Sequence, residues 1–346
     1  MKHYVGLDVA LKTTQICVMD QEQKIVAEAK IETHPEALSQ YLFKLGLNYQ
    51  RVGLETGNLA QWLYTGMAEA GLPIICVDAR KIKSFLKLQK VNKNDRNDAR
   101  GIAKAMHIGT EHAVHMKTIE SQRMRSLLAA RKSIQIKMND LKMFVRGNIR
   151  QYGMKMDKVS LSMWEARVRE LIAGDNFLCM VVEPILVCIR TMRQQVVVLS
   201  KEINQITRGD PTCRLLMTCP GVGPVVSLTF KTSIDIPERF ANSQTVGAYL
   251  GLTPKQNQSG ETDKRGRISR AGDIAMRTAL VEAAHSMLSR GRACWLKEWA
   301  LKIKKRTNLF VAAIALARRL AVILHRMWVD KTEFCWEAAP KRAVAA

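Results

Sequence analysis

Acidic residues are scarce relative to basic ones in this chain. Its 346 residues include 54 Lys and Arg but only 31 Asp and Glu, which gives a net charge of +23. A surplus of this size favours a polyanionic partner, most often nucleic acid, because each phosphate contact releases counterions. An anionic membrane surface fits less well, since the basic residues are spread over several segments. A basic protein without such a partner is the simpler alternative.

Paired cysteines and uninterrupted apolar runs are also missing. The eight cysteines include no C-x-x-C pair, and several, such as Cys17 and Cys188, stand in apolar runs. This usage predicts reduced core residues of a cytosolic protein. We expect no secretory signal at the N-terminus. The longest apolar stretch, 309–328, is interrupted by Arg318 and Arg319, so it predicts a buried helix and no membrane partner.

Strand and helix patterns alternate over residues 1–117, and the chain is 47% apolar, enough to build cores. Strands are expected near 3–8, 13–19, 24–32, 51–55 and 73–77, and helices near 35–47, 58–71, 79–89 and 95–108. Three strands with short connections, followed by strand, helix, strand and helix, predict an RNase H-like α/β fold.

Residues 118–207 are expected to form a long helical, coiled-coil-like arm. Over 119–155 apolar residues recur at alternating three- and four-residue spacing, as in a coiled-coil seam. The seam comprises Met124, Leu127, Ile134, Met138, Leu141, Val145 and Tyr152. A second helical stretch, about 179–207, is expected to pair with it, either to join subunits or to grip nucleic acid. Arg131 and Arg146 are our candidate nucleic-acid contacts there.

Residues 208–346 are expected to form a third, mainly helical domain, which starts where Asp210-Pro211 breaks the chain. The sequence Pro-Gly-Val-Gly at 220–223 resembles the turn of a helix-hairpin-helix element. In such a turn, Gly221 and Gly223 let backbone N–H groups approach a phosphate. An ordinary glycine-rich turn between two helices is the alternative.

A polar segment, 255–272, is expected to be a long functional loop because it has no apolar periodicity before a helix over 274–290. Its Ser259 could attack phosphorus if nearby cations meet the developing charge. Composition alone favours an ordinary loop serine. The basic residues that follow it are candidate phosphate contacts: Lys264, Arg265, Arg267 and Arg270.

Four carboxylates stand at positions that this fold could bring together. Asp8 and Glu55 each follow an apolar run, and Asp95 and Asp98 lie three residues apart on an expected helix. Asp8 is expected in the centre of the first strand and Glu55 at the end of the fourth. Like charges repel unless a cation lies between them, and oxygen ligands favour Mg²⁺, with Mn²⁺ as the other candidate. The quartet therefore predicts a divalent metal site that acts on phosphodiesters.

Six short motifs in order resemble a known family. They are Gly-Leu-Asp at 6–8, Leu-Glu-Thr-Gly at 54–57, Lys-Asn-Asp-Arg-Asn-Asp-Ala at 93–99, Pro-Gly-Val-Gly at 220–223, Gly-Leu-Thr-Pro at 251–254, and Ser-Gly at 259–260 followed by Arg-Gly-Arg-Ile-Ser-Arg-Ala-Gly at 265–272. Together they are similar to the DEDD-type transposases of bacterial insertion sequences, in the IS one-ten family with its IS eleven-eleven branch. The likeness covers nearly the whole chain. Glu261 and Asp263, close to Ser259, depart from the pattern of many relatives.

The resemblance implies a function and the residues that perform it. The N-terminal domain would be RuvC-like, with Asp8, Glu55, Asp95 and Asp98 as its metal ligands. A C-terminal transposase domain would supply Ser259 as a nucleophile that forms a transient phosphoserine link to DNA. A bridge RNA would pair with donor and target DNA. The enzyme would be a recombinase that acts as a tetramer, a dimer of dimers.

Other functions stay open at this point. A RuvC-like nuclease that cuts DNA structures with water as the nucleophile needs the carboxylates but not Ser259. A sugar-kinase-like or actin-like ATPase also begins with a Gly-apolar-Asp motif, but here Asp8 is not followed by the glycine that lets backbone approach ATP phosphate. A non-catalytic nucleic-acid-binding protein would need no metal at all.

Overall fold

The protein was analysed as a computed structural model that describes residues 1–88, 94–109, 113–259 and 262–337. The chain divides into two compact units, Met1–Lys117 and Thr118–Ala346. Both the expected arm and the expected C-terminal domain fall in the second unit. The two units are described separately below.

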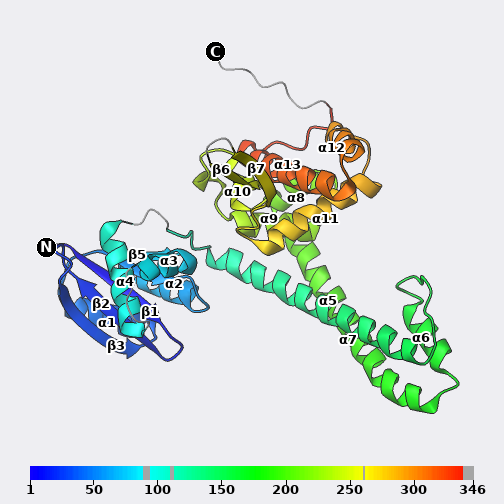
Figure 1. The fold of residues 1–346 in the computed structure, drawn as a ribbon, viewed down its shortest axis with the longest axis horizontal. Coiled ribbons are helices and arrows are strands. Elements are labelled where there is room, and N and C mark those ends of the chain that lie inside the picture. The colour runs from blue at the N-terminus through cyan, green and yellow to red at the C-terminus, as the bar shows by residue number, and fades with distance from the viewer. Residues whose placement is uncertain (89–93, 110–112, 260–261, 338–346) are drawn as a thin grey trace. The chain divides into compact units, whose positions relative to one another are not determined.

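The first unit is built on a five-stranded sheet (Figure 1). Its strands are β1 (His3–Val9), β2 (Thr13–Met19), β3 (Ile25–Glu32), β4 (Tyr49–Glu55) and β5 (Ile74–Val77). They lie in the order β3-β2-β1-β4-β5. The three N-terminal strands form an antiparallel meander, and β4 and β5 continue the sheet in parallel with β1. The strands expected from the sequence are therefore confirmed, and the order is that of an RNase H-like fold.

Helices cover both faces of this sheet. They are α1 (Pro35–Lys44), α2 (Ala60–Glu69), α3 (Ala79–Leu88) and α4 (Asp95–Ile108). Alternation along β1 sends Val5 and Leu7 into a core with Leu38 of α1 and Leu63 of α2. Helix α4 covers the opposite face of the sheet, which carries Tyr4, Gly6 and Asp8.

Two facing glycines let α4 lie close to this sheet. Gly6 on β1 pairs with Gly53 on β4. A Cβ at Gly6 would lie 2.1 Å from the carbonyl oxygen of Ala99 and 2.4 Å from the amide nitrogen of Ala103, both backbone atoms of α4. A Cβ at Gly53 would lie 2.6 Å from Met106 Cγ. Only glycine fits at Gly6 without displacing the helix.

The second unit begins with two long helices that pack against each other, α5 (Ile119–Gln151) and α7 (Asn176–Gly209), and the shorter α6 (Trp164–Ile172) lies between them in sequence (Figure 1). The pairing of two long helices is confirmed, whereas α6 was not expected. Val145 of the expected seam is fully buried, but Tyr152 is 52% exposed because it follows the last residue of α5.

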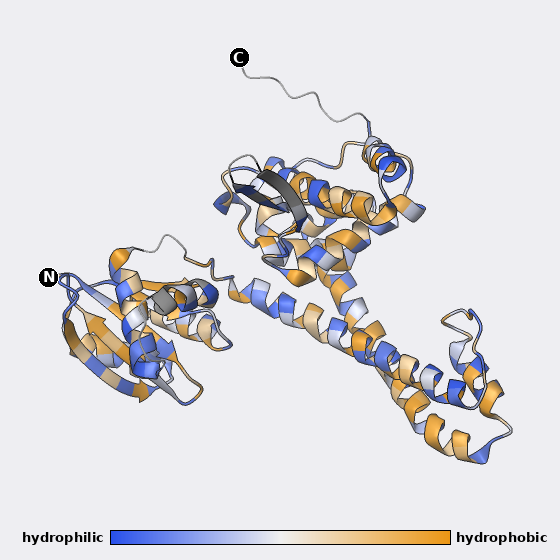
Figure 2. Ribbon diagram, viewed as in Figure 1, coloured by the Kyte–Doolittle hydropathy of each residue, from blue (hydrophilic) through white to orange (hydrophobic). Residues whose placement is uncertain are grey.

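Part of the α7 surface is hydrophobic yet open. The half of α7 that begins at Asn176 is largely hydrophobic in Figure 2. Phe177, Met180 and Val187 are more than half exposed there. Cys188 is also exposed, so its placement in the core was wrong. The apolar residues around Cys188 are consecutive, so they lie on all sides of α7. Those on one side of the helix are outside its contact with α5.

The rest of the second unit is mainly helical. It contains α8 (Pro211–Met217), α9 (Pro224–Ile234), the 3-10 helix η1 (Pro237–Arg239), α10 (Thr245–Tyr249), α11 (Ile274–Arg290), α12 (Trp295–Arg306) and α13 (Leu309–Asp330). The helices expected over 274–290 and 309–328 are confirmed. Their core includes Phe230, Leu280 and Leu316, all fully buried. None of the described helices is both long and apolar enough to cross a membrane.

The segment expected to be a long loop is instead mostly a β-hairpin. Strands β6 (Pro254–Ser259) and β7 (Thr262–Ile268) pair in antiparallel, with Ser259 opposite Thr262. Periodicity missed these strands because their side chains are nearly all polar, so no apolar face alternates with a polar one. The glycine at position 260 of the sequence is a signal that is typical of a hairpin between two strands.

We predict that Gly6→Ala destabilises the first unit by about 3 kcal/mol or more, at the upper end of overpacking effects, because the new methyl group meets helix backbone that cannot rotate away. The measurement is hydrogen exchange of peptides from β1 and α4 in a urea series. Gly57→Ala is the matched control, since a Cβ there has no neighbour within 4 Å. Equal protection in both variants would contradict the close approach of α4.

Candidate functional site

Two of the four carboxylates lie side by side at the carboxyl ends of neighbouring parallel strands. Leu7 of β1 pairs with Leu54 of β4, so Asp8 and Glu55 are the next residues along each strand. Asp8 is the penultimate residue of β1, not central in it as expected, and Glu55 ends β4. Both follow a glycine by two positions and therefore project from the face that α4 covers. Both are half-buried.

The other two carboxylates lie in the first turn of α4, and the direction of this helix brings them to the same end of the sheet. Near its C-terminus, His107 makes an edge contact with Tyr4, near the start of β1. In its middle, Ala99 and Ala103 lie against Gly6. The helix therefore runs antiparallel to β1.

It follows that the N-terminus of α4 lies toward the carboxyl end of β1, where Asp8 and Glu55 are. Asp98, directly before Ala99, is half-buried, whereas Asp95 is exposed one turn earlier. The topology thus places the four residues toward the same end of the sheet.

The start of α4 is fixed by a cap. The Asn94 side chain accepts a hydrogen bond of 2.8 Å from the backbone N–H of Asn97, and the extended backbone of Asn94 begins the helix there. This is the usual role of asparagine at an N-cap. The cap sets which residues occupy the first turn, and these include Asp95 and Asp98.

A salt-bridge cluster ties the same end of α4 to β3. Arg100 donates two hydrogen bonds to Glu28, of 2.6 and 3.1 Å, and Arg96 donates a third of 2.7 Å. These bonds, first of all that from Arg100, lower the pKa of Glu28 to about 2. The Glu28 side chain is only 11% exposed, so solvent screens the pairs weakly. This cluster could not be predicted from the sequence, because nothing in the sequence pairs Glu28 with residues about seventy positions away.

The donor set suits a hard divalent cation. All four candidate groups are carboxylates, which Mg²⁺ and Mn²⁺ prefer. In the part of the chain that the structure describes, no three His, Cys, Asp or Glu side chains are gathered closely enough to hold a metal ion. Burial and the charge of Glu55 raise the pKa of the Cys76 thiol to about 11.

Ser259 lies at the far end of β6, next to the turn of the hairpin, and is exposed. Gly260 and Glu261, which complete the predicted motif, fall outside the described residues, as do the side chains of Lys264 and Arg265. The described side chains of Arg267 and Arg270 are exposed at the other end of the hairpin. The serine hydroxyl is accessible, and the hairpin separates it from these two arginines.

The remaining predicted nucleic-acid contacts also have internal roles. A Cβ at Gly221 would lie 2.5 Å from the carbonyl oxygen of Ala283 in α11, and its φ is +81°, so packing alone requires glycine there. Gly223 is the N-cap of α9, and a Cβ there would meet nothing within 4 Å. The Arg131 guanidinium donates a 2.8 Å hydrogen bond to Ser200 of α7. Arg146 donates one of 3.3 Å to the Met156 carbonyl.

We predict that Glu28→Gln lowers the stability of the first unit, and that the loss depends on pH. The Glu28 pKa falls from 4.5 to about 2 on folding, so the unfolded chain binds the proton more tightly. The stabilisation is therefore complete above pH 4.5 and disappears as pH falls to about 2. Urea unfolding of wild type and variant across this range measures the difference.

The control for this experiment is Glu22→Gln, which removes a carboxylate from an exposed pair with Lys24. Exposed pairs contribute little at any pH. A wild-type-minus-variant difference for Glu28 that stays constant down to pH 2 would contradict the assigned role of the cluster.

Comparison with known proteins finds similarity over most of the chain. Residues 5–154 match a family described as transposase, of the DEDD type of IS110, and residues 213–300 match the transposase IS116/IS110/IS902 family. The chain is 26% identical to the transposase for insertion sequence element IS1111A of Coxiella burnetii, over 92% of this chain and 88% of that protein. It is 23% identical to a "Probable family 20 transposase" of Pseudomonas aeruginosa, over 92% and 95%. It is 25% identical to the transposase for insertion sequence element IS1328 of Yersinia enterocolitica, over 82% and 84%. Two regions of the chain are thus similar, in order, to the DEDD transposase family of IS110 and to the transposase IS116/IS110/IS902 family.

Proposed function

We propose that this protein is an insertion-sequence transposase that cleaves and rejoins DNA, with a divalent metal ion at the carboxylates and Ser259 as a nucleophile. The observation that carries the proposal is the arrangement of the DEDD residues. Asp8 and Glu55 lie at the carboxyl ends of two adjacent parallel strands, and α4 brings Asp95 and Asp98 toward the same edge. Four carboxylates repel one another there unless a cation lies between them. A net charge of +23 favours DNA as the substrate.

The four carboxylates would hold Mg²⁺ or Mn²⁺ by drawing together around it. Such an ion stabilises the charge that develops on the oxygens of a phosphodiester as its bond is exchanged. Asp8 and Glu55 are held by strand pairing, and Asp98 by the capped helix and the Glu28 cluster. The backbone that carries these three residues is therefore held in place, and the exposed Asp95 has the most freedom to adjust.

Ser259 would attack phosphorus directly. Its Oγ–P bond forms as the P–O bond to the leaving deoxyribose oxygen breaks, the serine proton passes to solvent, and the leaving oxygen takes up a proton. The reverse step, with a different sugar hydroxyl, rejoins the strand and restores the serine. The hydroxyl suits this role because it is exposed at the end of a narrow ribbon, where a strand of DNA can reach it.

The resemblance to DEDD transposases supports finer proposals. A bridge RNA would pair with donor and target DNA and so choose the sites. A tetramer, a dimer of dimers, would combine the carboxylates of one subunit with the serine of another. The open hydrophobic half of α7, with Phe177 and Met180 exposed, provides a surface that subunits could share.

We predict that Asp95→Asn combined with Asp98→Asn lowers DNA cleavage roughly 100-fold or more, because amides bind a divalent ion far more weakly than carboxylates. DNA binding should persist, since it depends on the basic residues. Cleavage of a labelled substrate at increasing Mg²⁺ measures the effect. Asp157→Asn, outside the site, is the control. Cleavage by the double variant at the wild-type rate, or by wild type in excess EDTA, would rule out the metal assignment.

We predict that Ser259→Ala abolishes both cleavage and the covalent protein–DNA adduct, because alanine has no hydroxyl oxygen that could form the Oγ–P bond. Denaturing gel electrophoresis of labelled DNA detects the adduct. The RuvC-like nuclease alternative uses water, so under that alternative the variant still cleaves and no adduct forms with wild type. Ser269→Ala, in the segment after β7, controls for the loss of a nearby hydroxyl.

A further inference from the structure

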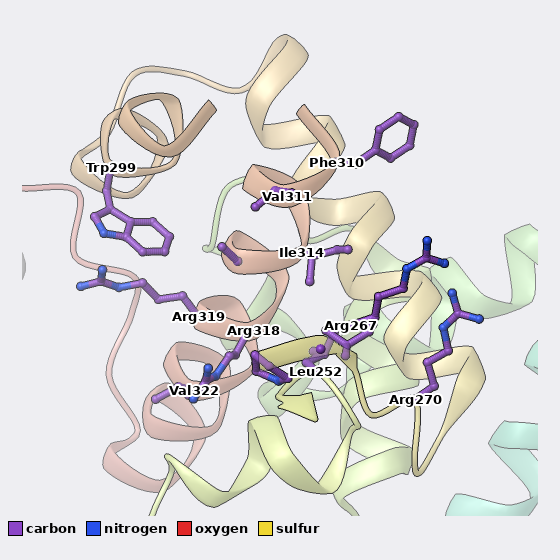
Figure 3. A pocket seen from close by; sticks show the side chains of 14 residues that line it. Leu252, Arg267, Arg270, Trp299, Phe310, Val311, Ile314, Arg318, Arg319 and Val322 are labelled. Carbon is purple, nitrogen blue, oxygen red and sulfur yellow. The ribbon is translucent and has the colours of Figure 1, made fainter. Parts of the chain in front are cut away.

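The second unit contains a cavity of about 1000 Å³ beside the base of the hairpin (Figure 3). One wall is the end of the hairpin remote from Ser259, including Pro254 and Ile268. The others are α12, through Trp299, and the exposed side of α13, from Phe310 to Val322. Its volume lies at the upper end of the range of roughly 300–1,000 Å³ for ligand sites.

The lining combines hydrophobic surface with positive charge. The Phe310 ring makes an edge contact with His285 and is still 73% exposed at the start of α13, and Val311 is 43% exposed. These large apolar side chains therefore face water. Every charged residue of the lining is an arginine: Arg267, Arg270, Arg318 and Arg319. No carboxylate among the lining residues offsets them.

Two tryptophans hold one of these arginines in place. The Arg319 guanidinium lies over the ring of Trp299, 4.5 Å from its centroid, and 5.1 Å from that of Trp295. Burial lowers the pKa of Arg319, although an arginine stays charged. A cation held between aromatic rings at the edge of a hydrophobic cavity is arranged in advance for an anion.

We infer that this cavity binds an unstacked nucleotide of single-stranded nucleic acid, with its base against the hydrophobic lining and Phe310 and its phosphates on the arginines. A base offers flat faces for stacking, and each nucleotide carries a negative charge, so both halves of the lining are matched. A duplex keeps its bases stacked and offers only phosphates, which leaves the hydrophobic surface without a partner.

The distance of the cavity from Ser259 indicates which nucleotide of a bound strand it would hold. This inference rests on the proposed function of Ser259 as the nucleophile. Strand β6 separates Pro254 from Ser259 by five residues, or about 17 Å of extended chain. A nucleotide in the cavity therefore flanks the phosphate at Ser259 and is not itself the reacting one. The cavity would hold the strand on one side of the cut.

The test is binding of the full chain, in EDTA so that no strand is cut, to three labelled probes: a short oligothymidine, the same oligonucleotide without bases, and a short duplex. We predict that Phe310→Ala weakens binding of oligothymidine about 5- to 100-fold. Binding of the base-free strand and of the duplex should stay unchanged. Phe43→Ala is the matched control, because Phe43 is also an exposed phenylalanine on a helix and does not line the cavity.

A second variant examines the charged half of the lining. Arg267→Gln should weaken binding of the base-containing and base-free strands alike and lower the slope of the salt dependence by about one. Arg214→Gln removes an exposed arginine that does not line the cavity, and it should leave the oligothymidine affinity within about twofold of wild type.

Several outcomes would overturn the inference. In one, Phe310→Ala binds oligothymidine as wild type does, and in another it loses the base-free strand and the duplex to the same degree. In a third, the variant changes oligomeric state in sedimentation, which would make the cavity a contact between subunits. Failure of the proposed chemistry is distinguishable, because these measurements need neither metal nor turnover, and the Asp95→Asn, Asp98→Asn variant should bind oligothymidine normally.

Discussion

The candidate metal site depends on how closely a helix can approach a sheet. Without a side chain at Gly6, the backbone of α4 lies directly on β1, and this contact sets both the height and the direction of the helix. Because α4 runs antiparallel to β1, its first turn arrives where the parallel strands β1 and β4 end. Residues separated by ninety positions, Asp8 and Asp98, lie toward the same end of the sheet for this reason. A larger residue at position 6 would lift the helix and with it two of the four carboxylates.

Charge pairing completes what packing begins. Glu28 on β3 binds Arg96 and Arg100, which flank Asp98 on α4, so the same helical turns that carry the acids are anchored to the sheet by their basic neighbours. The positively charged residues of the chain thus have two different roles. Some arginines serve inside the fold, as Arg131 does with Ser200, and others, such as Arg267, remain exposed and available to a polyanion.

Most of the first unit was predictable because its strands and helices have strong periodic patterns and short connections. The strand order and the placement of Glu55 followed from that pattern. The hairpin around Ser259 was not predictable by the same means, because strands with polar side chains on both faces hide their periodicity. The role of Glu28 was also out of reach, since it depends on strand register and helix direction together. At position 221, either a phosphate contact or close packing would require glycine. The close approach of Ala283 shows that packing requires it.

The direction of α4 has an electrostatic consequence for the site without its ion. The aligned peptide dipoles of a helix place a partial positive charge at its N-terminus, and acidic side chains in the first turn are stabilised by it. Here that terminus points to the edge where Asp8 and Glu55 end their strands. The backbone itself therefore offsets part of the repulsion among the acids. A cation at the proposed site would then bind to strands and a helix that are already held by packing and charge pairing, unlike the ion of the small metal-dependent domains that unfold when the metal is removed.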